Sequence, residues 1–217
     1  MIKAVLFDLD GTLADTAPDL GIALNNVLQK QNLPPKTMAE IRPVASHGAA
    51  GLIKLGTGMQ PDNPAFAALR QDFMDEYELH FTDQTVLFGG INELLEKLAE
   101  QNIAWGIITN KPHVFTDRLV PKLGCSIEPA VIVSGDTTSA PKPSTEPMFY
   151  ACRHIGVAPE NCLYIGDAER DMQAGRNAGM ITVLANWGYI GAEDNISQWP
   201  ADYIVEQPKE ILQLLNK

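Results

Sequence analysis

Two aspartates near the N-terminus, Asp8 and Asp10, directly follow the apolar run Ala4–Phe7 and precede Gly11. A short continuous apolar run predicts a buried strand, so both carboxylates are expected at a strand end. Neighbouring carboxylates repel each other unless a cation lies between them, and Mg²⁺ prefers hard oxygen ligands of this kind. A glycine lets the backbone turn sharply and approach a ligand. The stretch indicates either a metal-dependent site or a strand-end turn with solvated aspartates.

Polar side chains also follow the second and third apolar runs of the chain. The run 103–109 ends at Thr109 and is followed by Asn110, and a hydroxyl and an amide can both donate hydrogen bonds to anionic oxygens. Lys142 stands between two prolines beyond the run 130–134, so its ammonium group is a compact positive charge on a stiff loop. These residue types are suited to binding an anion.

A second pair of aspartates, Asp167 and Asp171, follows the apolar run 162–166. Their spacing of four places both carboxylates on one face of a helix that begins there. In open parallel sheets, ligands bind at the carboxyl ends of the strands. Because four such ends supply carboxylates, a hydroxyl and an amine in a consistent order, we predict that they form one site.

The elements that must position these residues are strands and helices in alternation. Further apolar runs lie at 180–185 and 202–206, and apolar residues repeat at helical spacing over 91–98 and in the segments after Thr145 and Asp167. Runs without alternation are typical of strands buried on both faces. The pattern predicts an α/β fold, with a parallel sheet covered by helices on both sides.

The region from Pro18 to Thr85 breaks this alternation because it contains no convincing strand. Apolar stripes at helical spacing run over 20–28 and again over 66–77, so a helix-rich insert is expected after the first strand. The short stretch 56–58, Gly-Thr-Gly, is interpreted as a loop, because no strand precedes it as in a nucleotide-binding fingerprint.

Composition excludes several classes of partner. The net charge of −11 and the lack of any Lys/Arg run argue against nucleic acid or an anionic membrane. Three cysteines without metal-ligand spacing indicate reduced thiols in the cytoplasm. No apolar stretch approaches the roughly 18 residues that a membrane span needs.

The length of 217 residues predicts one domain with a smaller insert. We expect the protein to be a monomer or a homodimer.

The sequence resembles the haloacid-dehalogenase-like (HAD) phosphatases over essentially its whole length. Four motifs carry the resemblance: DLDGT at 8–12, Thr109 in IITN, Lys142 in PKP, and GDAERD at 166–171. The resemblance implies a Rossmann-like parallel-sheet core made of residues 1–17 and 86–217. It also implies an inserted α-helical cap of the C1 type at residues 18–85.

Under this resemblance, Asp8 is the nucleophile that forms an aspartyl-phosphate with the substrate. Asp10 is the general acid for the leaving alcohol and then the base for the hydrolytic water. Asp8, the backbone carbonyl of Asp10 and Asp167 are the implied Mg²⁺ ligands. A carboxylate two residues after the nucleophile points to phosphatase or phosphomutase chemistry rather than dehalogenation.

The same resemblance assigns the remaining motif residues. Thr109 and Lys142 hold phosphoryl oxygens, and Asn110 assists them in binding the substrate. Asp171 orients water or Lys142 from outside the ligand shell of the metal. The expected activity is therefore Mg²⁺-dependent hydrolysis of a small phosphorylated metabolite.

The stretch 41–49 of the cap contains Arg42, Ser46 and His47, which we predict to contact the substrate. A guanidinium can bind a carboxylate or phosphate through two hydrogen bonds, whereas a solvated helix charge is the ordinary role of such an arginine. Ser46 and His47 precede a glycine where the backbone can approach a ligand, although a loop or capping role would suit His47 equally.

Only the resemblance to known enzymes limits the range of possible substrates. The chain is similar to phosphoglycolate phosphatase-like enzymes, but Ala-Ser-His-Gly at 45–48 replaces their usual V-G-x-G-like turn. The cap stretch, and a tail with Tyr189 and Trp199, look more like the N-acetylmuramic acid 6-phosphate phosphatases of cell-wall recycling. The alternatives are 2-phosphoglycolate as substrate, a sugar phosphomutase, or a non-catalytic regulatory protein on the same scaffold.

Overall fold

The computed structural model describes residues 1–215, and its centre is a sheet of six parallel strands in the order β5-β4-β1-β6-β7-β8. The strands are β1 (Ala4–Phe7), β4 (Ala104–Ile108), β5 (Val131–Val133), β6 (Cys162–Gly166), β7 (Ile181–Ala185) and β8 (Tyr203–Val205). They confirm the expected parallel α/β sheet, and three strands (β4, β5 and β8) are one residue shorter at each end than their apolar runs. Because β1 lies between β4 and β6, the strand order reverses direction at β1.

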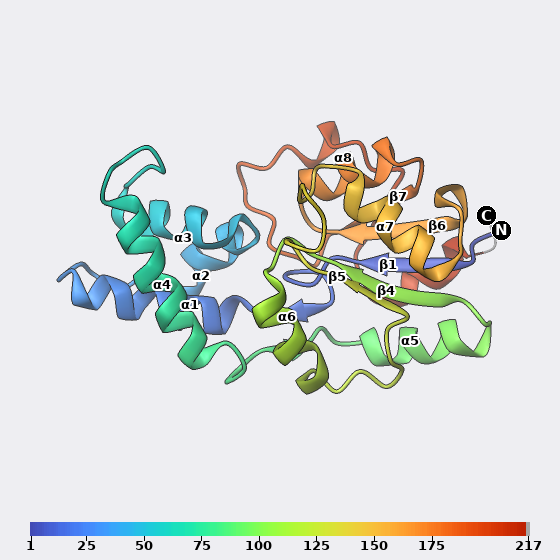
Figure 1. Cartoon of the computed structure of the whole chain (residues 1–217), viewed down its shortest axis with the longest axis horizontal. Coiled ribbons are helices and arrows are strands. Elements are labelled where there is room, and N and C mark those ends of the chain that lie inside the picture. The colour runs from blue at the N-terminus through green and yellow to red at the C-terminus, as the bar shows by residue number, and fades with distance from the viewer. Residues whose placement is uncertain (216–217) are drawn as a thin grey trace.

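Helices cover both faces of this sheet (Figure 1). One face carries α5 (Ile91–Glu100) and α6 (His113–Leu119), and the opposite face carries α7 (Glu146–Ile155) and α8 (Glu169–Asn177). Short 3-10 turns complete the chain: η1 (Arg42–His47), η2 (Val120–Lys122), η3 (Pro159–Asn161), η4 (Ile196–Gln198) and η5 (Pro208–Leu214). The sequence did not predict α6, which has only two helical turns in which a pattern could repeat.

The side chains of β1 divide the core into two layers. Val5 and Phe7 pack in the cluster that contains the apolar residues of α5, whereas Leu6 packs with Met148 of α7 and Ala174 of α8. Side chains alternate across a strand, so a strand between two helical layers must be apolar at every position. This requirement explains the unbroken apolar run at the start of the chain.

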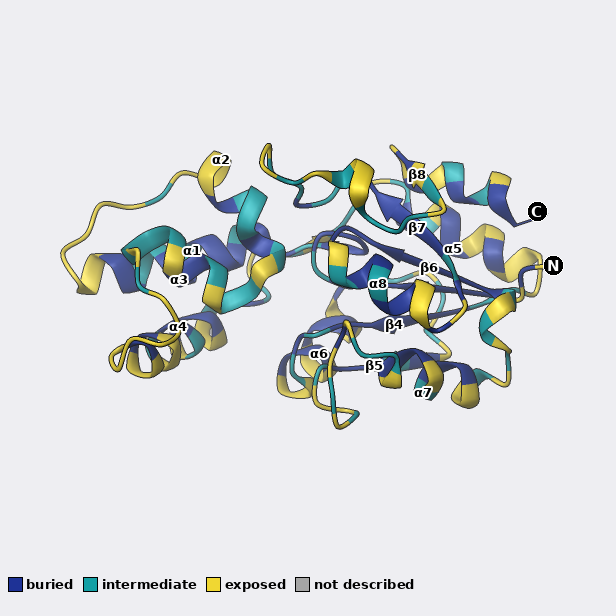
Figure 2. Cartoon of the chain, turned by 90° about the horizontal axis from the view of Figure 1, so that it is seen from above, coloured by how far each residue is buried: buried dark blue, intermediate teal, exposed yellow. Residues whose placement is uncertain are grey.

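The insert forms a helical lobe at one side of the sheet (Figures 1 and 2). It contains α1 (Ala17–Lys30), α2 (Met38–Ile41), α3 (Gly48–Thr57) and α4 (Phe66–His80). Two strands of two residues each, β2 (Ala14–Asp15) and β3 (Val86–Leu87), pair antiparallel where the chain enters and leaves the lobe. Strands this short have no periodicity, so the sequence did not predict them.

The interpretation of 56–58 as a loop was wrong for its first two residues. Gly56 and Thr57 form the end of α3, and Gly58, with φ of +72°, ends the helix in the left-handed conformation that favours glycine. A Cβ atom on Gly56 would lie 2.8 Å from a side-chain atom of Leu28. The glycine therefore allows α3 to approach α1 closely, a packing role that the sequence pattern did not reveal.

The carboxyl ends of the strands face the helical lobe, and the N-terminus lies at the far end of the sheet (Figure 1). Within residues 1–215, no helix is both long enough and apolar enough to span a membrane. The loops that follow the strands therefore lie between the sheet and the lobe, where they can form a site.

Candidate active site

Asp8 lies directly after β1 with 1% of its surface exposed. Its Oδ1 atom accepts a hydrogen bond from the backbone N–H of Leu9 at 2.7 Å and lies 2.9 Å from Nζ of Lys142. Its Oδ2 atom is 4.0 Å from a guanidinium nitrogen of Arg170. One oxygen of Asp8 is thus held by the protein, and the other borders the cavity described below.

The ammonium group of Lys142 is enclosed by oxygen atoms. It lies 2.7 Å from Oδ1 of Asp171 and 2.9 Å from Oδ1 of Asp8, and it donates to the carbonyl of Ile108 and the hydroxyl of Tyr164. Asp171 also accepts from the backbone N–H of Ala168 at 3.1 Å. Asp171 therefore contacts Lys142 directly, as its predicted orienting role requires.

Asp167 follows β6 and approaches the loop after β1. A Cβ atom on Gly11, whose φ is +81°, would lie 2.2 Å from Oδ2 of Asp167, so only glycine allows this approach. The same carboxylate accepts from the backbone N–H of Tyr189 at 2.8 Å and from the hydroxyl of Ser46 at 2.7 Å. The Ser46 bond joins the helical lobe directly to an expected metal ligand.

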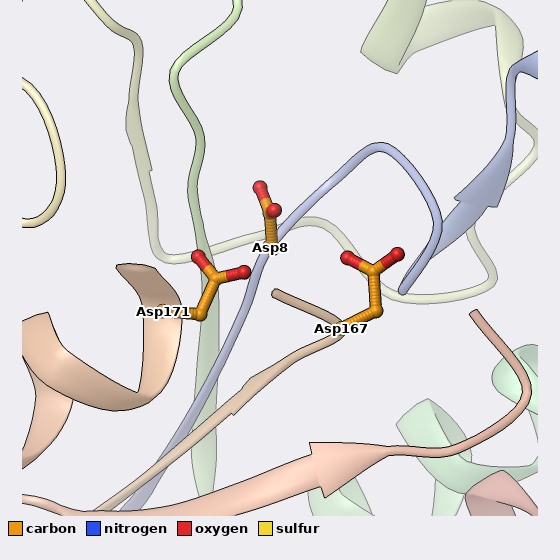
Figure 3. A group of neighbouring side chains, drawn as sticks. All are labelled: Asp8, Asp167 and Asp171. Atoms are coloured by element: carbon orange, nitrogen blue, oxygen red, sulfur yellow. The ribbon is translucent and has the colours of Figure 1, made fainter. Parts of the chain in front are cut away.

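Asp8, Asp167 and Asp171 form a cluster of buried carboxylates in which one oxygen from each lies within 4.8 Å of the others (Figure 3). Burial is the main cause that raises the pKa of Asp8 to about 6 and the pKa of Asp167 to about 7. The neighbouring carboxylates raise both pKa values further, because like charges oppose ionisation.

This donor set fits Mg²⁺, because it offers hard oxygens whose crowded charges are costly without a cation. Both oxygens of Asp171 are engaged within the protein, Oδ1 with Lys142 at 2.7 Å and Oδ2 with the backbone N–H of Ala168 at 3.1 Å. Asp8 and Asp167 are therefore the side chains that we expect to hold the ion.

Asp10 is separated from this cluster by its own ion pair. Its Oδ1 atom lies 2.8 Å from Nζ of Lys111 and accepts from the hydroxyl of Thr16 at 2.6 Å. Burial would raise the pKa of Asp10, but Lys111 and Thr16 outweigh it and hold that pKa below its usual value. Asp10 is therefore a carboxylate in this state.

Lys111 had no predicted role, although this lysine follows Asn110 in the same strand-end loop.

Thr109 and Asn110 lie between β4 and α6 and both line the cavity beside Asp8. The side-chain amide of Asn110 donates to the carbonyl of Lys142 at 2.9 Å and accepts from its N–H at 2.9 Å. Asn110 therefore positions the Lys142 loop, a contact that differs from its predicted direct binding of substrate.

The predicted cap residues divide into two groups. Ser46 and His47 line the cavity, whereas Arg42 is absent from its walls. Arg42 forms an ion pair with Asp15, and its guanidinium lies 5.9 Å from the ring centroid of Tyr189. The structure therefore does not bring Arg42 to the site with Ser46 and His47.

A cavity of about 420 Å³ lies between the strand ends and the helical lobe. Its floor is formed by the strand-end residues, and its opposite wall by side chains of α1, η1, α3 and α4. Four residues that line it had no predicted role at the site: Arg70, Tyr77, Lys111 and Arg170. Arg170 stands inside the GDAERD motif and Arg70 inside an apolar stripe. The sequence therefore showed the elements to which they belong, but not that they line the cavity.

The four motifs converge here on one buried cluster of carboxylates and the ammonium group of Lys142. The sequence pattern of haloacid dehalogenase-like hydrolases matches residues 5–185 of the chain. The protein belongs to this family.

Two curated HAD relatives span nearly the whole chain. An N-acetylmuramic acid 6-phosphate phosphatase from Pseudomonas aeruginosa is 39% identical over 217 residues, which cover 100% of this chain and 96% of the relative. A phosphoglycolate phosphatase from Xanthomonas campestris is 41% identical over 209 residues, covering 96% and 94% of the two chains. The expectation that this HAD protein is an enzyme, a phosphatase, is confirmed.

A solved HAD structure has the same fold throughout. The predicted phosphoglycolate phosphatase from Haemophilus somnus is 26% identical, with a TM-score of 0.85 over 98% of this chain and 97% of its own. The Rossmann-like HAD architecture expected from the motifs is thus confirmed.

Proposed function

We propose that this HAD phosphatase hydrolyses a phosphomonoester through an aspartyl-phosphate on Asp8 and depends on Mg²⁺. The supporting observation is that Asp8 has one oxygen held by Leu9 and Lys142, while its other oxygen borders the cavity beside Arg170. The fixed oxygen orients the carboxylate, and the second oxygen is left to attack phosphorus. Lys142, Lys111 and Arg170 supply positive charge around this point despite the acidic surface.

Mg²⁺ would be held by Asp8, Asp167 and, as the family resemblance implies, the backbone carbonyl of Asp10, and bound there it would offset negative charge on the transferring phosphoryl group. The protein's own contribution is orientation. Lys142 and Asp171 fix Asp8, and Thr109 lies where its hydroxyl can donate to a phosphoryl oxygen.

Asp10 is proposed to exchange protons with the leaving alcohol and then with water. Its lowered pKa makes it a carboxylate in this state, which suits removal of a proton from the hydrolytic water. The earlier protonation of the leaving group requires Asp10 to bind a proton first. Contact of Lys111 with the substrate phosphate would favour protonation of Asp10, because it would weaken the ion pair between Lys111 and Asp10, whose atoms lie 2.8 Å apart.

Residues 18–85 are proposed to be the cap that reads the substrate. The cavity of about 420 Å³ lies within the range of roughly 300–1,000 Å³ that is typical of sites for drug-sized ligands. Apolar side chains of the cap, including Phe73 and Met74, form much of its wall. A phosphorylated sugar with methyl-bearing substituents fits such a space, and N-acetylmuramic acid 6-phosphate carries a methyl group on both its acetyl and its lactyl substituent.

2-Phosphoglycolate is the second candidate substrate, since several relatives at 40–41% identity are named for it. Its two-carbon body would occupy only a small part of the cavity, so we place it after the muramic ester.

The thiols of Cys125, Cys152 and Cys162 are all free, which supports a reducing compartment such as the cytoplasm.

The test is phosphate release, with Mg²⁺ and with EDTA, from N-acetylmuramic acid 6-phosphate, 2-phosphoglycolate, glucose 6-phosphate and glucose 1-phosphate. We expect Mg²⁺-dependent release with the muramic ester preferred, and no turnover by Asp8→Asn at unchanged circular dichroism. Turnover by Asp8→Asn would refute the nucleophile. Preference for 2-phosphoglycolate would refute the muramic ester, and isomerisation of glucose 1-phosphate with little release would indicate a phosphomutase.

A further inference from the structure

Helix α4 presents a continuous stripe of side chains to the cavity. Arg70, Phe73, Met74 and Tyr77 all line it, and their spacing of three, four and seven residues places them on one helix face. In Figure 1 the C-terminal end of α4 lies toward α6 and the sheet, whereas its N-terminal end projects away from them. The stripe therefore runs from the floor of the cavity outward.

Tyr77 marks the inner end of this stripe. Its ring centroid lies 5.1 Å from that of Phe115, and Nζ of Lys111 lies 4.8 Å from its ring centroid. Because Lys111 is also 2.8 Å from Asp10, the Tyr77 end of α4 adjoins the catalytic carboxylates. The hydroxyl of Tyr77 is buried beside Lys111, so this end of the stripe is closed and marks the floor of the cavity.

Arg70 lies at the outer part of the same stripe. Seven residues of helix at 1.5 Å each separate its backbone from that of Tyr77 by about 10 Å along the axis. The two side chains between them, Phe73 and Met74, are apolar. A ligand that contacts both ends must therefore be long and have an uncharged middle section.

The guanidinium of Arg70 has no salt-bridge or hydrogen-bond partner in the part of the chain that the structure describes, and the residue is exposed. The other basic side chains of the cavity differ, since Lys111 pairs with Asp10 and Arg170 lies 4.0 Å from Asp8. Arg70 is thus free to bind an anion, and the planar guanidinium matches a carboxylate with two parallel hydrogen bonds.

We infer that Arg70 binds a carboxylate of the substrate that is remote from the phosphate ester, so that the site selects phosphorylated sugar acids. This inference rests on the proposed function, because it takes the phosphate to lie at Asp8. N-Acetylmuramic acid 6-phosphate meets the requirement, since its lactyl carboxylate and its phosphate leave the sugar ring from different carbons. The carboxylate of 2-phosphoglycolate is separated from its phosphate ester by a single CH₂ group, so the inference predicts no contact of that ester with Arg70.

The experiment measures kcat/KM for N-acetylmuramic acid 6-phosphate and for N-acetylglucosamine 6-phosphate, which lacks only the lactyl group. Para-nitrophenyl phosphate serves as a third substrate that reports phosphatase activity alone. Wild type should prefer the muramic ester, and Arg70→Gln should lower the ratio of the two sugar values about 10-fold, as expected for loss of a charge-assisted hydrogen bond. Arg153→Gln, a change on the exposed face of α7 outside this cavity, should keep the wild-type ratio.

An unchanged ratio in Arg70→Gln, or a wild type that does not distinguish the two sugars, would overturn the inference while the proposed phosphatase activity stands. Failure of wild type to release phosphate from any of the three esters would instead overturn the proposed function. The two failures are therefore distinguishable in one set of assays.

Discussion

Nζ of Lys142 lies 2.7 Å from Oδ1 of Asp171, and neither side chain is exposed to solvent. The pair joins the loop after β5 to the start of α8, two segments that the sequence separates widely. The same ammonium contacts Asp8, so the pair fixes the position of the proposed nucleophile. Removal of Asp171 would leave the buried ammonium group of Lys142 with Asp8 as its remaining carboxylate partner among the described residues.

We therefore expect Asp171→Ala to destabilise the protein by about 3–5 kcal/mol, the usual cost of breaking a buried ion pair. Urea unfolding followed by circular dichroism measures the change. Glu100→Ala is the matched control, because it removes the exposed partner of Lys97 on α5 and should cost about 1 kcal/mol or less. Equal losses in the two variants would contradict the structural importance of the Lys142–Asp171 pair.

Mg²⁺ should stabilise the folded protein, and this effect should depend on Asp167 as a ligand of the ion. Mg²⁺ that binds only the folded state stabilises it by about 2.7 kcal/mol at a concentration of 100 Kd. We expect Mg²⁺ to raise the Tm of wild type over that in EDTA, and Asp167→Asn to abolish most of this shift. Asp136→Asn, at an exposed carboxylate beside His113, should retain it. A full shift in Asp167→Asn would show that the ion is held elsewhere.

Arg170 is expected to stabilise charge on the transferring phosphoryl group. It lines the cavity, its guanidinium is 4.0 Å from Asp8, and its Nε atom is buried without a partner among the described residues. Arg170→Met should lower kcat/KM for para-nitrophenyl phosphate about 100-fold, the scale for removing one preorganised donor. Arg176→Met on the exposed side of α8 provides the comparison, and similar kinetics in both variants would exclude this role.

Stability of the cap should depend on pH through Glu76. Hydrogen bonds from Lys30 and Asn26 hold the pKa of Glu76 below its usual value of 4.5. A lowered pKa in the folded state means that the carboxylate contributes stability above pH 4.5 and loses it as the pH falls through the folded pKa. Glu76→Gln should therefore be less stable than wild type by about 1 kcal/mol at pH 7, with the difference shrinking below pH 4.

Urea unfolding at pH 7 and at pH 3.5 measures this difference. Glu78→Gln is the control, because Glu78 is an exposed residue of the same helix that pairs with Arg118. A constant difference between wild type and Glu76→Gln at both pH values would contradict the assigned pKa direction.

The sequence predicted the convergence of these side chains because the residues follow strands. Carboxyl ends of parallel strands meet at one edge of a sheet, so Asp8, Thr109 and Asp167 had to converge once the strands were recognised. Their spacing within motifs and the apolar runs before them are local features that one sequence contains in full. The same reasoning placed the helical insert between the first strand and the rest of the sheet.

Contacts between the lobe and the sheet were not predictable in this way. Arg42 was expected at the substrate but pairs with Asp15, while Arg70 and Tyr77 line the cavity although they looked like members of an ordinary amphipathic stripe. Which face of α4 meets the cavity depends on how the lobe docks, and docking is decided by many weak contacts between distant segments.

The sequence by itself thus determined the family, the sheet, and which carboxylates and lysine follow the strands. These features are local, because the apolar runs and the motifs that follow them stand next to each other in the chain. Only the tertiary structure decided the remainder, namely the Ser46–Asp167 hydrogen bond, the pairing of Asp10 with Lys111, and the unpaired Arg70 at the outer end of the cavity. Each of these depends on long-range packing, which fixes side-chain partners that no local pattern in the chain encodes.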